Sequence, residues 1–179
     1  MTVVILGSRR AIEVRPIEQA DAEELAAAYL RLSPDSKYQR FFALKPRLTG
    51  ADLRYLTEID GDDHVALVAT PAGEHAPIIA VGRYVRLPDD LQTAEFAITV
   101  GDPYQREGIA TVLVEQLADI AGAHGIKHAT ATMLGTNLGA HKLMHRLATR
   151  LAKRCPTCGG KAYERHVGST DEIVVDLAV

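Results

Sequence analysis

The hydrophobic pattern changes its period along this chain, and that change constrains the fold more than any other feature of the sequence. Three β-rich runs are separated by turn-forming Pro, Gly and Asp residues, at His64–Thr70, Ile78–Leu87 and Thr93–Val100. Directly afterwards, over Gly108–Ala123, apolar residues recur at three- and four-residue spacing, which indicates an amphipathic helix. Three strands so close in sequence predict an antiparallel meander, against which the helix packs.

The flanking segments continue this mixture of strands and helices. Further strands are expected at Ala11–Arg15, Lys127–Leu134, Lys161–Val167 and Glu172–Ala178. Further helices are expected at Glu18–Leu32, from Pro34 toward Phe42, at Thr49–Ile59 and from Asn137 to about Lys153. Ser33 and Thr49 stand where N-caps belong, and Pro34 follows as a first helical residue. This order predicts an α/β fold of the α+β kind, a mixed sheet covered by helices.

Length and charge place the chain among compact globular proteins. A chain of 179 residues is expected to form one domain over residues 1–179. Its net charge of −3 is too balanced for a protein dedicated to nucleic acid or to a membrane surface, so neither partner is expected. The first apolar stretch, Val3–Leu6, is too short for a signal or a membrane span, and two cysteines make no disulfide framework. A cytoplasmic location is therefore expected.

The segment between the meander and the long helix has the features of an anion site. It reads Gly101-Asp102-Pro103-Tyr104-Gln105-Arg106-Glu107-Gly108-Ile109-Ala110. A strand that turns into a helix presents backbone N–H groups at the positive end of the helix dipole. Gly108 lets an anion approach the backbone, and a pyrophosphate is the natural ligand. The same residues also fit a plain tight turn, and without a Gly-Lys-Ser/Thr ending they are not a P-loop.

The strand Thr93–Val100 carries one acidic side chain. Alternation places Ala94, Phe96, Ile98 and Val100 on one face, and Thr93, Glu95, Ala97 and Thr99 on the other. From this pattern alone, Glu95 is either a solvated residue on an open sheet face or a carboxylate that faces a substrate.

Two short motifs stand at the starts of the two long expected helices. The first, Gln105-Arg106-Glu107-Gly108-Ile109-Ala110, fits the pattern Q/R-x-x-G-x-G/A, and the second, Asn137, Ala140 and Leu143, fits N-x-x-A/S-x-x-L. With these motifs and this order of elements, the chain resembles the GNAT superfamily of N-acetyltransferases. Within it, Leu32-Ser33-Pro34, Arg40-Phe41-Phe42 and Ala94-Glu95-Phe96-Ala97 are similar to the bacterial protein lysine acetyltransferases of the Pat type.

This resemblance implies a GNAT acyl-CoA N-acyltransferase fold, with a largely antiparallel central sheet flanked by helices. It also implies a V-shaped splay between the Thr93–Val100 and Lys127–Leu134 strands, and acetyl-CoA as co-substrate. The residues expected to bind acetyl-CoA are Ile98, Thr99 and Val100 for the pantetheine, Gln105, Arg106, Glu107, Gly108, Ile109 and Ala110 for the pyrophosphate, and Asn137 with Lys142 on the last long helix. Glu95 matches the general base of the Pat-type enzymes. A base is useful because a lysine amine, with a pKa of about 10.4, is protonated at neutral pH.

The expected activity is therefore the transfer of an acetyl group from acetyl-CoA to a primary amine, that of a protein lysine. A small-molecule amine is the first alternative acceptor, and a non-catalytic acyl-CoA-binding regulatory module is the second alternative. The place where many GNAT enzymes carry a general-acid Tyr holds Met144, a residue of the apolar stripe that is expected in the core. No general acid is assigned, and both a monomer and a homodimer remain open.

One further motif lies outside this scheme. Cys155 and Cys158 form a C-x-x-C pair, and His141 with His145 could complete four zinc ligands. A continuous helix would place Cys155 about 15 Å beyond His145 along the axis, so a shared site needs the chain to fold back. A reduced turn is therefore preferred over a zinc site or a redox pair, and no metal ligand is predicted.

Overall fold

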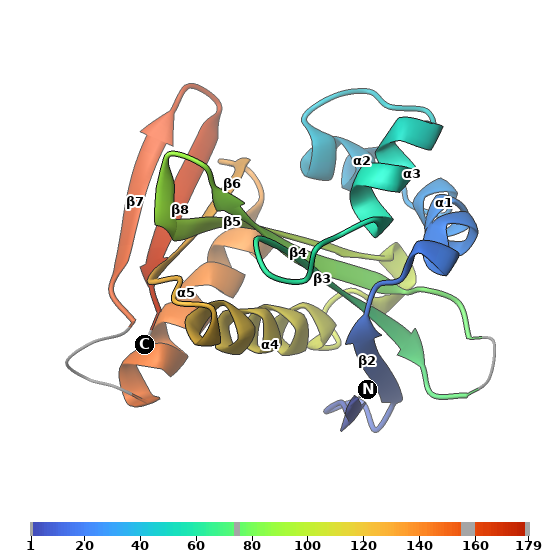
Figure 1. Ribbon diagram of the computed structural model, residues 1–179, viewed down its shortest axis with the longest axis horizontal. Helices are drawn as coiled ribbons and strands as arrows, with labels where there is room; N and C mark the ends of the chain where they lie inside the picture. Colours follow the sequence, from blue (N-terminus) through green and yellow to red (C-terminus); the bar gives the residue numbers. More distant parts are fainter. Residues whose placement is uncertain (1, 74–75, 155–159, 178–179) are drawn as a thin grey trace. The chain divides into compact units, whose positions relative to one another are not determined.

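The computed structural model describes residues 2–73, 76–154 and 160–177 (Figure 1). Its strands are β1 (Thr2–Ile5), β2 (Ala11–Pro16), β3 (His64–Pro71), β4 (Ala80–Leu87), β5 (Asp90–Val100), β6 (His128–Leu134), β7 (Ala162–Val167) and β8 (Thr170–Asp176). Its helices are α1 (Ala22–Leu30), α2 (Pro34–Phe41), α3 (Gly50–Thr57), α4 (Ile109–Ala123) and α5 (Leu138–Arg154), with short 3-10 turns η1 (Gln19–Asp21) and η2 (Asp102–Tyr104).

The sheet is mixed and mostly antiparallel, as predicted. In the described residues its strands follow the order β1-β2-β3-β4-β5-β6-β8-β7. The pairs β1–β2, β2–β3, β6–β8 and β7–β8 are antiparallel, whereas β5 and β6 are parallel. The parallel ladder is short, as a splay between two strands requires: it runs from Thr93↔His128 to Glu95↔Thr130, while β6 remains paired with β8 as far as Leu134.

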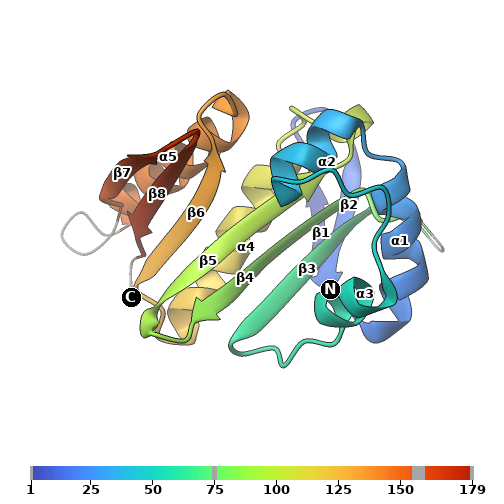
Figure 2. The same cartoon turned by 90° about the horizontal axis from the view of Figure 1, so that it is seen from above.

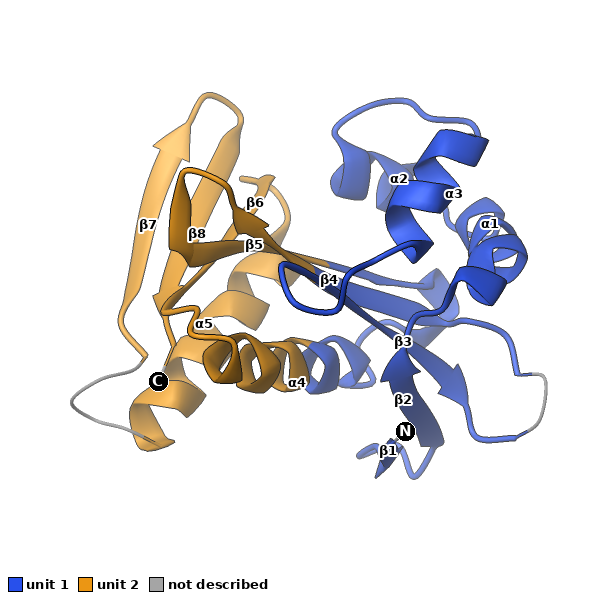
Figure 3. Cartoon of the chain, in the orientation of Figure 1, with its two compact units in different colours: residues 1–83, 98–113 blue, residues 84–97, 114–179 orange. Residues whose placement is uncertain are grey.

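The chain divides into two compact units (Figure 3). Unit 1 comprises residues 1–83 and 98–113, and unit 2 comprises residues 84–97 and 114–179. The expectation of one domain over residues 1–179 stays a prediction. In the described parts of both units, no helix has the length and apolar character that a membrane span requires.

Unit 1 has its core between the first helices and the sheet. Tyr29 of α1 and Leu56 of α3 are buried in one cluster with Ala66 and Val68 of β3. Figure 2 shows α1 and α3 beside this strand, and the two helices contact each other. Burial of these apolar side chains, at roughly 1.5–3 kcal/mol for each large one, holds the helical segment on the sheet.

Side-chain caps start two of these helices, as the sequence indicates. Ser33 Oγ accepts a hydrogen bond from Ser36 N at 3.2 Å at the start of α2. Thr49 Oγ1 accepts from Asp52 N at 3.2 Å, and the Asp52 carboxylate accepts from Thr49 N at 2.7 Å, which makes a capping box at α3. Each cap satisfies an N–H group that has no partner within its helix.

Unit 2 is held together by α5 on one face of β6 and β8. The buried side chains of α5 are Met144, Leu147, Ala148 and Leu151, and those of β8 include Ile173 and Val175. The two elements contact each other, and α5 also contacts β6. Met144 is only 3% exposed, which confirms that it belongs to the core. By contrast, every residue of β7 is exposed.

Two elements differ from the sequence-based expectations. Strand β1 was not predicted, because Val3 and Ile5 are exposed and the segment lacks a clear alternation. This strand forms by pairing with β2, with Thr2 opposite Val14 and Ile5 opposite Ala11. The first helix was also expected to begin at Glu18, but residues 19–21 form a 3-10 turn before α1 begins at Ala22.

A buried cation lies where the sequence indicated only a strand. Arg83 of β4 is 5% exposed, and its guanidinium donates to the carbonyl of Leu56 at 3.2 Å and lies 3.0 Å from His64 Nε2. Leu56 is in the last turn of α3, where carbonyl groups attract positive charge. Burial lowers the pKa of Arg83 to about 10, and burial together with Arg83 lowers the pKa of His64 to about 4.

The shifted pKa of His64 predicts a pH-dependent stability. Between about pH 6.5 and pH 4, His64 is protonated in the unfolded chain and neutral in the native chain. The free energy of unfolding should therefore decrease as the pH falls through this window. We expect His64 to account for about 2 kcal/mol of that decrease. A pKa difference of one between the folded and unfolded chain corresponds to about 1.4 kcal/mol, and solvent screens part of the effect. Urea titrations at pH 7 and pH 4.5 measure it, and His64→Gln should show a smaller decrease than the parent chain. Equal decreases in both proteins would contradict the assignment.

Candidate active site

The turn between β5 and α4 belongs to unit 1 and is fixed through its backbone. Ile98, Thr99 and Val100, the residues expected to bind pantetheine, end β5 and are half-buried. Gly101 N then donates to Ile79 O at 2.8 Å, and Tyr104 N donates to Gly101 O at 2.8 Å to close the η2 turn. A Cβ atom at Gly101 would lie 3.2 Å from Ile79 O, so glycine permits this close approach.

The carboxylate of Asp102 anchors this turn to the start of α2. It accepts hydrogen bonds from Ser33 N at 2.9 Å, Ser33 Oγ at 2.7 Å and Ser36 Oγ at 2.8 Å. Burial raises the pKa of Asp102, but these hydrogen bonds outweigh burial and hold that pKa below its ordinary value. The carboxylate is therefore ionised at neutral pH, and its hydrogen bonds fix the η2 turn against the start of α2.

Gln105 and Glu107 use their side chains for contacts inside unit 1. Gln105 Nε2 donates to Val100 O at 3.2 Å and to Ser36 Oγ at 3.3 Å. The Glu107 carboxylate accepts from Arg10 Nε at 2.9 Å and from Ser8 Oγ at 3.3 Å. A ligand of this turn can therefore meet the backbone of both residues, while their side chains shape the turn.

The start of α4 exposes the backbone that the sequence predicts as an anion site. Gly108 is exposed, has φ 96°, and would present an added Cβ to open space. Arg106 has φ 65° and is also exposed, whereas Ile109 is 1% exposed and fixes the helix to the core. Val112 N donates to Gly108 O, so the N–H groups of the residues between them precede the first helical hydrogen bond. With the half-buried Ala110, this arrangement can bind an anion through backbone amides.

Glu95 lies in unit 2, on β5. Its neighbours Ala94 and Phe96 are 0% and 4% exposed, whereas Glu95 is exposed, as the alternation predicts. It is paired across the parallel ladder with Thr130, which is buried. Within the part of the chain that the structure describes, its carboxylate makes no hydrogen bond or ion pair. Such a carboxylate is free to accept a proton from a bound molecule.

Asn137 and Lys142 also lie in unit 2. Asn137 Oδ1 accepts from Ala140 N at 3.1 Å, so this residue caps α5. Its NH₂ group makes no hydrogen bond to any residue that the structure describes. Lys142 is exposed on the first turns of α5, so its ammonium is open to solvent.

The structure brings residues 98–100 and 105–110 together in unit 1, and places Glu95, Asn137 and Lys142 in unit 2. The roles of all these residues stay predictions. Cys155 and Cys158 lie outside the described residues. Asp102 was not singled out from the sequence, although it organises the turn, because its partners are more than 60 residues away.

The sequence and the fold both have counterparts among known proteins. The model of the acetyltransferase (GNAT) family matches residues 22–148. Acetyltransferase Pat of Mycolicibacterium smegmatis is 36% identical over 124 residues, which are 69% of this chain and 37% of that protein. Acetyltransferase PA5475 of Pseudomonas aeruginosa is 32% identical over 124 residues, which are 68% of this chain and 66% of that protein.

A solved structure extends the similarity to nearly the whole chain. The GNAT domain of S. lividans PAT superposes with a TM-score of 0.83 at 30% identity, and the match covers 98% of this chain and 96% of that one. The two curated relatives are longer than their matched parts, since this chain covers less than two thirds of each.

Gly108 gives a direct test of the backbone geometry at the start of α4. Gly108→Ala should lower the free energy of unfolding by about 1–2 kcal/mol, because φ 96° strains any residue with a Cβ atom even where space is open. Gly139→Ala in α5 is the matched control: Gly139 has no positive φ and its Cβ would meet only Asn137 Oδ1 at 3.5 Å. That change should raise stability by up to about 1 kcal/mol. Urea denaturation measures both free energies of unfolding. If Gly108→Ala were as stable as the parent chain, the turn would not be held in this conformation.

Proposed function

Because this chain belongs to the acetyltransferase (GNAT) family, we propose that it transfers the acetyl group of acetyl-CoA to the side-chain amine of a protein lysine. The carrying observation is the similarity to Acetyltransferase Pat across 69% of the chain. The match covers only 37% of that relative. That this chain shares the activity and substrates of the whole relative is therefore part of the proposal. The resemblance of Ala94-Glu95-Phe96-Ala97 to protein lysine acetyltransferases supports the lysine acceptor.

The proposal assigns acetyl-CoA to the backbone of two short segments. The pantetheine runs along Ile98 to Val100, and the pyrophosphate binds the amides from Gln105 to Ala110. Support comes from the open backbone at Gly108 and from the tie between Asp102 and Ser33, which holds the turn before the ligand arrives. A turn that is already ordered loses little entropy on binding.

Glu95 is proposed as the general base. It takes one proton from the lysine ammonium, directly or through water, and the neutral amine then attacks the thioester carbonyl. The new C–N bond forms and the C–S bond breaks, with its electron pair leaving on the CoA sulfur. The second proton of the attached nitrogen passes through water to this thiolate, which leaves a neutral amide and the CoA thiol. The exposed carboxylate without a protein partner supports this role, because an ion pair would lower its basicity.

The leaving thiolate needs no acid from the protein in this scheme. Met144, at the place where related enzymes carry a Tyr, is buried and has no proton to give. A thiol has a pKa of about 8.5, so its thiolate is a good leaving group that water protonates afterwards.

Met144 is equally compatible with the second candidate, a non-catalytic acyl-CoA-binding module, because neither the module nor the proposed transfer needs an acid at this place. A small-molecule amine remains the alternative acceptor. The cytoplasmic location, the absence of nucleic-acid and membrane partners, and the oligomeric state stay predictions.

Removing the proposed base tests the mechanism. Glu95→Gln should lower the rate of CoA release by about 10²- to 10⁴-fold, which is the usual contribution of a general base, while acetyl-CoA affinity stays within a few-fold. The loss should shrink as the pH approaches the pKa of the amine, since more of the acceptor is then neutral. A thiol-reactive dye follows CoA release, with lysine-containing proteins and small amines as acceptors, and calorimetry follows acetyl-CoA binding.

Glu23→Gln, an exposed carboxylate on α1, is the matched control and should keep the parent rate. Equal rates for the parent and Glu95→Gln would exclude Glu95 as the base. Binding without turnover for every acceptor would favour the non-catalytic module, and turnover with small amines alone would exclude the lysine acceptor.

A further inference from the structure

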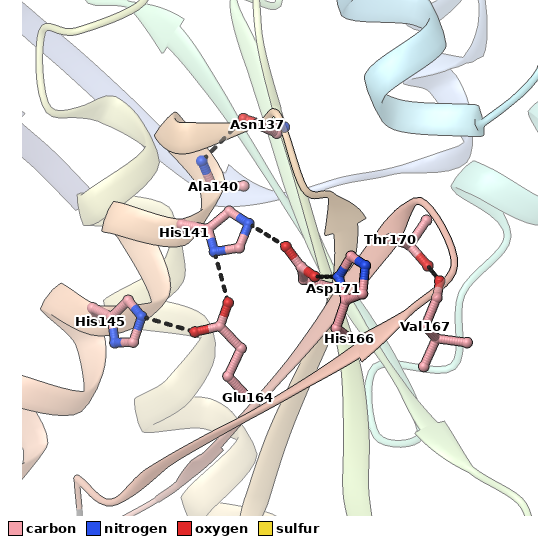
Figure 4. A network of polar contacts seen from close by, with 9 residues as sticks. All are labelled: Asn137, Ala140, His141, His145, Glu164, His166, Val167, Thr170 and Asp171. Carbon is pink, nitrogen blue, oxygen red and sulfur yellow. Dashed lines mark hydrogen bonds and ion pairs between the residues drawn. The ribbon is translucent and has the colours of Figure 1, made fainter.

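Five polar side chains gather where α5 faces the last hairpin of unit 2 (Figure 4). His141 and His145 are four residues apart on α5 and share one helix face. Glu164 and His166 are two residues apart on β7 and share one strand face. Asp171 of β8 is paired directly with His166. The helical and strand periods therefore direct imidazoles and carboxylates to the same place.

The distances make His141 the centre of this group. Its Nδ1 lies 3.3 Å from Glu164 Oε1, and its Nε2 lies 3.1 Å from Asp171 Oδ2. The second oxygen of each carboxylate faces another imidazole: His145 Nε2 is 3.6 Å from Glu164 Oε2, and His166 Nδ1 contacts Asp171 Oδ1. Both carboxylates thus turn one oxygen to His141 and one to an outer histidine.

The His141 ring cannot satisfy both carboxylates as a neutral imidazole. A neutral ring has one N–H donor and one lone-pair acceptor, and a lone pair repels a carboxylate oxygen. His141 Nε2 is fully buried and makes no hydrogen bond to any described residue, although Asp171 Oδ2 is close. A cation held between His141 Nε2 and Asp171 Oδ2 would turn this unfavourable contact into two favourable ones.

The pattern of contacts is that of a metal ligand with its supports. A histidine that binds a metal through one nitrogen commonly donates its other N–H to a carboxylate, and ligating carboxylates are themselves hydrogen-bonded. Each outer histidine faces the second oxygen of a carboxylate, so Glu164 and Asp171 both have the kind of support that ligating carboxylates receive. One ligand atom each from His141, Glu164 and Asp171 lies within 4.8 Å of the other two.

We propose that His141, Asp171 and Glu164 form a site for a divalent cation, and that Zn²⁺ is the ion these donors fit. Zinc prefers imidazole nitrogen and carboxylate oxygen at about 2.0–2.2 Å, which places neighbouring ligand atoms roughly 3.3 Å apart. His141 Nε2 and Asp171 Oδ2 already have this separation, and both side chains are 85–90% buried, with 15% and 11% exposed. Glu164 is 44% exposed, and its oxygen can leave Nδ1 and move toward the ion, which shortens a separation of at most 4.8 Å to the roughly 3.3 Å of tetrahedral bonding.

The site would strengthen the attachment of an edge strand to α5, which otherwise rests on the pair His145–Glu164 among the ion pairs of the described residues. All of β7 is exposed, so apolar burial does not fix it, and its backbone pairs with β8 alone among the described strands. An ion shared by α5, β7 and β8 ties the hairpin to the helix that packs on β6. The proposal concerns unit 2 alone and does not depend on the acetyl transfer.

Zinc binding to the full-length chain tests this proposal. After treatment with EDTA and dialysis, the chain should bind one Zn²⁺, as measured by calorimetry or by competition with a chromogenic chelator. The measurement is made in a Cys155→Ser/Cys158→Ser background, because that pair is an independent candidate for zinc. His141→Gln and Asp171→Asn should each weaken binding by at least about 10-fold, whereas His128→Gln, which alters another His–carboxylate pair (His128–Asp176, 2.9 Å), should not.

A second measurement separates binding from misfolding. Zinc should slow hydrogen exchange of the β7 amides in the parent chain and leave it unchanged in Glu164→Gln, where the replaced side chain is 44% exposed. The proposal fails if no saturable zinc binding occurs, if His141→Gln binds as tightly as the parent, or if the serine background abolishes binding.

Discussion

The ionised Asp102 carboxylate joins two parts of unit 1 that neither helix propensity nor apolar burial would bring into register. It accepts three hydrogen bonds from Ser33 and Ser36, so the N-terminus of α2 and the turn that leads into α4 share one acceptor. Charge-assisted hydrogen bonds of this kind contribute roughly 1.5–3 kcal/mol each when partly buried. The conformation of Gly101 to Gly108, and with it the proposed pyrophosphate site, depends on this group. Removing it would leave two hydroxyls and a backbone N–H competing for water.

Local chemistry explains why most elements could be predicted. The caps at Ser33 and Thr49, the apolar stripe that contains Met144 and the alternation around Glu95 all express preferences of residues close in sequence, and the structure confirms each of them. Strand β1 was missed because its existence depends on β2, whose sequence says nothing about the register Thr2↔Val14. The start of α1 was placed too early, since Asp21 pairs with Arg15 in two hydrogen bonds near 2.7 Å and stabilises a 3-10 turn instead.

The candidate site likewise combines features that the local sequence predicts with features that depend on residues far apart in the chain. The sequence motif indicated which residues surround Gly108, but not that the Glu107 side chain is held by Arg10, 97 residues away. Likewise, spacing alone identifies the H-x-x-x-H pair on α5 and offers Cys155 and Cys158 as its possible partners. The described structure gives His141 carboxylate partners from β7 and β8, because the register His166↔Asp171 brings them to the helix. Hairpin register depends on the packing of a whole sheet face, which single-sequence patterns do not encode.

The exposed β7 has a consequence for how copies of this chain could associate. As the last strand in the sheet order, it pairs on its outer side with no other described strand. Its side chains Glu164, Arg165 and His166 are charged or ionisable, so an added strand would have to bury charge beside them. The strand at the other end, β1, is short but presents Val3 and Ile5 at 58% and 66% exposure. Tyr163 and Val167 of β7 are exposed to a similar extent, at 57% and 55%, so the two edges differ in charge and length rather than in exposed apolar surface.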